Sequence, residues 1–102
     1  RKTKPGQVAI GSVGGAVEAL VRAIAREVAP KRINIVSPGS IDTPMVAAQG
    51  EERAAFYAKA TASNIIPRAG TADEVAQGII FLIQNDFVTG TTVDVDGGWL
   101  LS

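Results

Sequence analysis

A short β-branched segment, residues 32–36 (RINIV), constrains the fold more than any other part of the 102-residue chain. Pro30 precedes it and the turn residues 37–39 (SPG) follow it, so it predicts a strand that is covered on both faces. A second strand is predicted at 92–95 (TVDV), just before the sharp turn 96–98 (DGG). Helical patterns separate the two segments, and strands joined by helical crossovers are parallel neighbours in an α/β fold.

Three helices are predicted around these strands. From about residue 12 to residue 28, apolar side chains recur at intervals of three and four until Ala29-Pro30 ends the helix. Residues 51–63 are rich in helix formers, and a third helix follows the capping-box spacing of Thr71 and Glu74. We expect residues 1–9 to be a loop or an extended lead-in. Residues 40–50 have no periodicity and predict a loop or mobile segment.

Two strands and three helices do not make a complete α/β layer. Parallel strands are normally buried on both faces, and an open sheet typically has about five or six strands. The elements therefore need further strands, from a part of the chain that is absent here or from another copy. We favour the absent part, because an independent domain would rarely begin on a basic loop that leads into a packed helix.

Composition narrows the possible functions. Ten basic and ten acidic residues cancel, which gives no electrostatic reason to expect nucleic acid or an anionic membrane as a partner. Cysteine and histidine are both missing, so thiolate sites and the commonest general base and metal ligand are excluded, and no metal site is predicted. No apolar run approaches the roughly 20 residues of a membrane span, and the opening residues lack a signal-peptide pattern. We expect a cytoplasmic protein without a membrane partner.

Four motifs occur in one order along the chain: APKRIN, then PG with TP, then PRAGTADEV, then TGTTVDVDGG. Together they resemble the C-terminal half of a short-chain dehydrogenase/reductase, from about Ala16 to Trp99. The resemblance implies that the two strands are the last two of a Rossmann-type, doubly wound parallel sheet. Residues 1–102 would then be the C-terminal half of a single NAD(P)-binding domain, with the glycine-rich turn for the pyrophosphate lying upstream.

By the same resemblance, the segment from Arg32 to Met45 forms the nicotinamide side of a cofactor pocket for NAD or NADP. Pro38 would hold the turn rigid, and Gly39 would let the backbone approach a flat ring. The backbone at Ile41 would hydrogen-bond the nicotinamide carboxamide, and the Thr43 hydroxyl would contact the carboxamide or the pyrophosphate. Taken alone, the same residues also fit an ordinary turn followed by a helix start.

The chain departs from the family at the catalytic pair, a tyrosine and a lysine four residues later. The resemblance places Ile10 at the tyrosine position and Gly14 at the lysine position, and neither side chain can ionise. The single tyrosine, Tyr57, lies two residues before Lys59 and does not match the motif. We interpret Tyr57 as a lid or packing aromatic rather than a catalytic group.

Three functions remain open from the sequence. The first, which we favour, is an NAD(P)-dependent oxidoreductase that moves a hydride between nicotinamide and a small carbonyl or alcohol, with a proton donor other than the family tyrosine. The second is a cofactor-binding sensor, and the third is an oligomer-assembly piece. A homo-oligomer, dimer or tetramer, is expected because the first helix and last strand commonly form subunit interfaces in this family. The substrate pocket would involve the loop 45–64, where Val46, Ala47, Phe56 and Tyr57 suggest an apolar wall.

Overall fold

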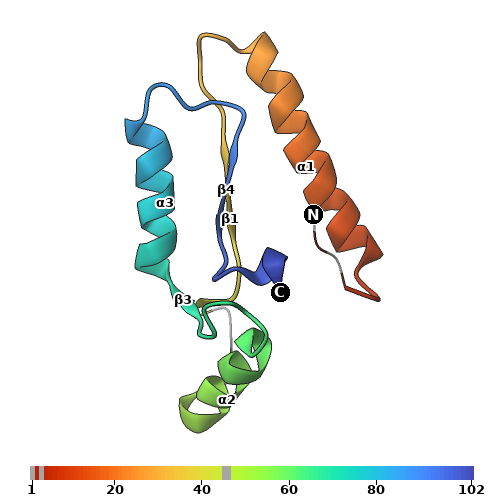
Figure 1. Ribbon diagram of the computed structural model, residues 1–102, viewed down its shortest axis with the longest axis vertical. Coiled ribbons are helices and arrows are strands. Elements are labelled where there is room, and N and C mark those ends of the chain that lie inside the picture. The colour runs from red at the N-terminus through yellow and green to blue at the C-terminus, as the bar shows by residue number, and fades with distance from the viewer. Residues whose placement is uncertain (1, 3, 45–46) are drawn as a thin grey trace.

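The structure is a computed structural model that describes residues 2, 4–44 and 47–102, so Met45 and Val46 of the predicted pocket lie outside the described residues. Helices and short strands alternate along the chain, as Figure 1 shows. The elements are α1 (Val8–Glu27), β1 (Ile35–Pro38), β2 (Ile41–Asp42), α2 (Gly50–Thr61), β3 (Gly70–Thr71), α3 (Ala72–Gln84), β4 (Thr92–Val95) and the 3₁₀ helix η1 (Trp99–Leu101).

The two predicted strands pair in parallel, which confirms the α/β fold. Strand β1 lies beside β4 with Ile35 opposite Thr92 and Pro38 opposite Val95. Strand β4 has the predicted bounds, whereas β1 begins three residues later than the predicted strand 32–36. The reason is that residues 32–34 bind the loop before β4: the Ile33 carbonyl accepts from the Gly90 amide at 2.7 Å instead of joining a strand ladder.

Two polar side chains in the RINIV segment bind the end of α3 and the loop that follows it. The Arg32 guanidinium donates to the carbonyls of Leu82 at 2.7 Å and Ile83 at 2.9 Å, near the end of α3 where carbonyls lack helical partners. The Asn34 amide donates to the Val88 carbonyl at 3.0 Å and accepts from the Thr91 amide at 3.1 Å. These contacts set the path of the chain from α3 into β4.

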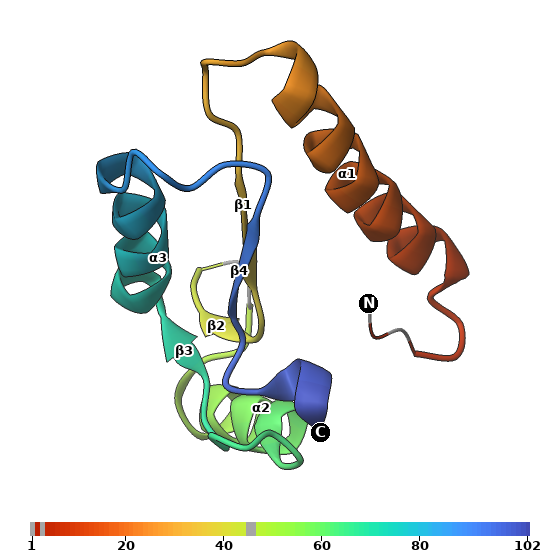
Figure 2. The same ribbon diagram turned by 45° about the horizontal axis from the view of Figure 1, so that its top comes forward.

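Helices lie on both sides of the β1–β4 pair. In Figures 1 and 2, α3 stands on one side of the strands and α1 on the other, which gives a helix–sheet–helix layering. Helix α3 approaches the strands closely at Gly78, where a Cβ atom would lie 3.1 Å from a Val95 methyl group. Helix α1 begins at Val8, about four residues earlier than predicted, so the end of the predicted lead-in 1–9 is helical: the Gly11 amide already bonds the Gln7 carbonyl at 2.9 Å.

The prediction of an unstructured segment at 40–50 was wrong at its start. Residues Ile41 and Asp42 form β2, which pairs in parallel with β3, Ile41 opposite Gly70 and Asp42 opposite Thr71. A two-residue strand has no periodicity to detect, and its partner lies far along the chain. Helix α2 starts at Gly50 and ends at Thr61, two residues before the predicted end.

Most large apolar side chains of the helices are exposed. Among the described residues, the buried hydrophobic side chains are Val21, Tyr57 and Leu82. Exposed ones follow α1 and α3 and include the fully exposed Phe87; they are Val8, Ile10, Val13, Val17, Leu20, Ile79, Ile80, Phe81, Ile83 and Phe87. Such surfaces normally pack against other elements, which agrees with the expectation that further strands complete the sheet.

Helix α1 also bears on the membrane expectation. With 20 residues, it is long and apolar enough to cross a membrane by length and composition alone. The core helix of a soluble protein meets the same criterion, so this is weak evidence. The expectation that no apolar run approaches this length was therefore wrong by that measure, while the absence of a membrane partner stays a prediction.

The exposed faces lead to a prediction for the 102-residue chain by itself. We expect it to self-associate and to bind the dye ANS, because strand edges and apolar helix faces are open to solvent. Light scattering after size-exclusion chromatography and a thermal melt followed by circular dichroism measure this. A monodisperse monomer that melts cooperatively would contradict it.

Candidate functional site

The four residues predicted to hold the cofactor lie around one hollow. Pro38, Gly39, Ile41 and Thr43 line a space of about 470 Å³ at the carboxyl end of β1. Ligands of open α/β sheets bind beyond the carboxyl ends of the strands, so the position fits a ligand site. Ser40 of the same loop also lines it, and the remaining walls come from α2 and the start of α3 and are mostly apolar, namely Phe56, Tyr57, Ala72 and Val75.

Gly39 is required where it stands. Its amide donates to the Val95 carbonyl at 2.9 Å, which carries the β1–β4 pairing past the end of the strand. A Cβ atom at this position would lie 2.8 Å from the Asp96 Cα atom and 3.2 Å from the Asp96 carbonyl oxygen. The glycine therefore lets the loop after β1 lie directly against the turn after β4, with no side chain between them.

The short β2–β3 pairing turns the loop toward α3. The Gly70 amide donates to the Ser40 carbonyl at 2.9 Å, and Thr71 then caps α3. Thr71 accepts from the Glu74 amide at 3.1 Å while Glu74 Oε1 accepts from the Thr71 amide at 3.0 Å, which confirms the predicted capping box. The start of α3, with Ala72 and Val75 in the wall of the hollow, is thereby tied to the loop.

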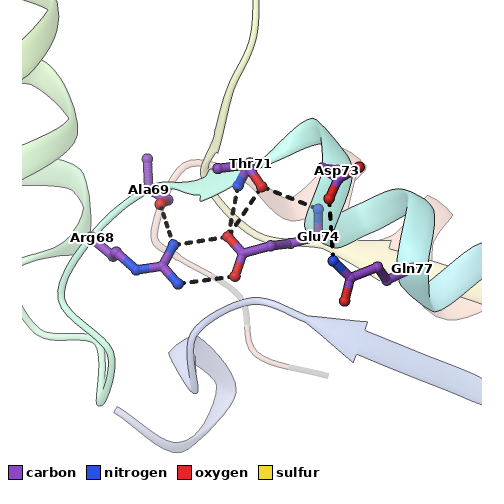
Figure 3. A network of polar contacts seen from close by, with 6 residues as sticks. All are labelled: Arg68, Ala69, Thr71, Asp73, Glu74 and Gln77. Atoms are coloured by element: carbon purple, nitrogen blue, oxygen red, sulfur yellow. Dashed lines mark hydrogen bonds and ion pairs between the residues drawn. The ribbon is translucent and has the colours of Figure 1, made fainter.

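An exposed ion pair reinforces this cap (Figure 3). The Arg68 guanidinium donates to Glu74 Oε1 at 2.8 Å and to Oε2 at 2.9 Å, and it also donates to the Ala69 carbonyl at 3.0 Å. The hydrogen bonds from Arg68, followed by the Thr71 amide, lower the pKa of Glu74 from 4.5 to about 2. Arg68 and Glu74 also border a neighbouring hollow of about 290 Å³ together with Ser40 and Ile41.

Tyr57 binds the loop rather than pointing a free hydroxyl into the hollow. Its side chain is only 8% exposed, and its hydroxyl donates to the Ile41 carbonyl at 2.9 Å. One turn earlier, Arg53 binds the Asp42 carboxylate. The packing interpretation of Tyr57 therefore agrees with its burial, but neither bond to the loop was predicted from the sequence. The available signal was the spacing of Arg53 and Tyr57 on one helix face, soon after an acidic loop residue.

Ile10 and Gly14, which the resemblance places at the positions of the catalytic pair, lie beside the loop. They border a third hollow, of about 220 Å³, between α1 and the strand ends, together with Pro38 and Gly39. Ile10 is 71% exposed. Lys2 and Ser37 border the same hollow. The turn at Pro38-Gly39 thus borders both this hollow and the hollow of about 470 Å³ next to α2.

Within the described ranges, no group of three or more histidine, cysteine, aspartate or glutamate side chains is arranged to hold a metal ion.

Comparison with known proteins decides the family. The family model for enoyl-(acyl carrier protein) reductase matches residues 1–100. The chain is 37% identical over 101 residues to a short-chain dehydrogenase/reductase of Stachybotrys chlorohalonatus, covering 99% of this chain and 40% of that protein. The chain belongs to the short-chain dehydrogenase/reductase family.

Other members of this family show the same partial coverage. The rat 3-oxoacyl-[acyl-carrier-protein] reductase is 38% identical over 104 residues, which cover 99% of this chain and 41% of that enzyme. A crystal structure of a small-chain dehydrogenase in complex with NADPH matches with a TM-score of 0.88 and 34% identity, covering 100% of this chain and 47% of that one. The chain therefore spans less than half the length of these relatives, and its architecture is part of the Rossmann-type fold.

We predict that Gly39→Ala destabilises the whole protein that carries this chain by about 1–3 kcal/mol, the usual cost of forcing extra atoms into a packed site. The added Cβ atom would meet the Asp96 backbone, which has no rotamer to change. Urea unfolding measures the difference. Ser40→Ala is the control, because it alters the adjacent residue without adding an atom near Asp96; equal stability of Gly39→Ala and wild type would contradict the prediction.

The Glu74 pKa predicts a pH dependence. Because the folded-state pKa is about 2 and the ordinary value is 4.5, ionised Glu74 stabilises the fold above pH 4.5, and this contribution is lost as the pH falls toward 2. Glu74→Gln should therefore lower the melting temperature near neutral pH and converge with wild type in acid. Thermal melts across this range test it, with Asp73→Asn as the control for loss of a first-turn charge; a pH-independent difference would count against it.

Proposed function

We propose that this chain forms the C-terminal half, residues 1–102, of a single NAD(P)-binding Rossmann-type domain, and that the whole protein is an oxidoreductase. It transfers a hydride between the nicotinamide and a small carbonyl or alcohol substrate. The observation that carries the proposal is the hollow beyond β1, where Pro38, Gly39, Ile41 and Thr43 lie together. The similarity to a 3-oxoacyl-[acyl-carrier-protein] reductase and to an NADPH complex supports it.

The residues of the hollow fit a nicotinamide. Phe56, Ala72 and Val75 offer apolar walls to a flat ring, and Gly39 keeps side-chain atoms away from the strand end. In the proposal, the Ile41 backbone and the Thr43 hydroxyl bind the carboxamide side of the cofactor, and Thr43 also lies within the loop that would face the pyrophosphate. The bound cofactor supplies or accepts the hydride, and this chain orients it.

The proton must come from elsewhere. Ile10 and Gly14 carry no ionisable group, so in this proposal they shape the hollow on the α1 side and do not transfer a proton. Water or a residue of the upstream half is the donor. General acid catalysis is typically worth ~10²–10⁴-fold, so its loss slows hydride transfer without preventing it. The cytoplasmic location and the homo-oligomeric state remain predictions.

Cofactor binding is the direct test. We expect the whole protein to bind NADPH or NADH, seen as a change in nicotinamide fluorescence, and then to oxidise it with some members of a panel of aldehydes and ketones. Binding without turnover would favour the sensor over the enzyme. Absence of binding at millimolar cofactor would overturn both.

A matched pair of variants tests the loop. Thr43→Val removes the hydroxyl and should weaken cofactor binding about 2–12-fold, the equivalent of one net hydrogen bond. Thr92→Val makes the same chemical change at the opposite end of the β1–β4 pairing and should leave the affinity unchanged. Equal affinities of the two variants would show that the Thr43 hydroxyl does not bind the cofactor.

A further inference from the structure

Two side chains of α2, one helical turn apart, reach back to the loop beyond β1. The first is Arg53. Its Nε donates to the Asp42 carboxylate at 2.8 Å, and a terminal nitrogen bonds the same carboxylate and the Thr43 carbonyl, the latter at 2.6 Å. Its other terminal nitrogen donates to the Ala48 carbonyl at 3.3 Å. One guanidinium thus binds the loop both before and after the residues that lie outside the described ranges.

The second side chain is Tyr57. Its hydroxyl donates to the Ile41 carbonyl at 2.9 Å and accepts from the Thr43 amide at 3.4 Å. It therefore bridges the two backbone groups that flank Asp42. The hydroxyl acts as donor and acceptor at once, which uses most of its hydrogen-bonding capacity.

The position of Tyr57 is itself fixed by its neighbours. The fully buried Thr61 donates its hydroxyl to the Tyr57 carbonyl at 2.7 Å, and the Arg53 guanidinium lies 5.5 Å from the centre of the tyrosine ring. The Phe56 ring meets the Tyr57 ring edge-on with centroids 5.3 Å apart. Arg53 and Phe56 thus contact the ring itself, while Thr61 binds the backbone of the same residue.

As a result, α2 binds every residue from 41 to 43. Tyr57 holds the backbone of Ile41 and Thr43, and Arg53 holds the side chain of Asp42 and the carbonyl of Thr43. Phe56, on the same helix, forms part of the wall of the hollow that these loop residues line. A shift of α2 must therefore move both the loop and the wall.

We infer that Tyr57 is a positioning residue, which together with Arg53 clamps the loop 41–43 to α2 in the geometry that binds the nicotinamide end of the cofactor. The inference rests on the proposed function. Tyr57 does not transfer a proton, because its hydroxyl is bound to the loop backbone. It acts through Ile41 and Thr43, and it couples the loop to the helix that forms the apolar wall.

Two ligands separate positioning from general stability. NADPH or NADH reaches the loop with its nicotinamide, whereas adenosine 5′-monophosphate, or adenosine 2′,5′-bisphosphate if NADPH is preferred, carries only the adenine end. In the whole protein, Tyr57→Phe should weaken binding of the dinucleotide about 2–12-fold and leave the adenine-end ligand unchanged. This range is that of one net hydrogen bond, since the bond from the Thr43 amide is long at 3.4 Å. Fluorescence titration measures the affinity for the dinucleotide, and calorimetry measures the affinity for the adenine-end ligand.

The control is Lys59→Gln, an exposed change on the same helix that should alter neither affinity. Asp42→Asn is a second variant that weakens the clamp from the loop side and keeps Tyr57 intact. Asp42→Asn should also weaken binding of the dinucleotide and leave binding of the adenine-end ligand unchanged. Combined with Tyr57→Phe, its effect should be less than the sum of the two, because both changes release the same three residues.

The outcomes distinguish the two proposals. If wild type binds neither ligand, the proposed function fails. If wild type binds both and Tyr57→Phe matches it, the clamp has no positioning role and the inference fails while the function stands. An equal loss of both ligands in Tyr57→Phe and Asp42→Asn would mean that the clamp only stabilises the fold, which also overturns the inference. Should Tyr57→Phe fail to fold, Asp42→Asn alone decides the question by the same comparison.

Discussion

The parallel pairing of β1 with β4 is the contact on which the rest of the structure depends. It joins two segments far apart in the chain, and it brings the turn after β1 against the turn after β4, where Gly39 lies against Asp96. Arg32 and Asn34 hold the chain that leads into β4, so the end of α3 and the register of the strands are set together. Helix α3 then covers one face at Gly78.

The site follows from that pairing, because both strands end at the same edge. The loop beyond β1 forms the short β2–β3 pairing, and β3 leads directly into α3, which Thr71 caps. Arg53 and Tyr57 of α2 hold the loop from the other side. The hollow is therefore built by three separate stretches of chain around one strand end. That arrangement places backbone groups, hydroxyls and apolar side chains where a ligand would lie.

In the proposal, the chain provides the cofactor side of the site but not the acid. Ile10 and Gly14, which the resemblance places at the positions of the catalytic pair, border the hollow next to Pro38 and Gly39 and carry no ionisable group. Positioning and proton transfer are separate contributions to hydride transfer. In the proposal, this half of the domain positions the cofactor through the loop 41–43 and through α2.

Local patterns in the sequence determined the elements that depend on neighbouring residues. The sequence predicted the strand at Thr92–Val95 and the capping box of Thr71 and Glu74, and its motifs indicated the short-chain dehydrogenase/reductase family. Each of these depends on residues close together in the chain. The tertiary structure alone decided that Ile41 and Asp42 form a strand, that Arg32 binds the end of α3, and that Tyr57 holds the loop. Each of these contacts joins residues that are distant in sequence or have no periodic pattern, and such pairings are chosen by packing rather than by local propensity.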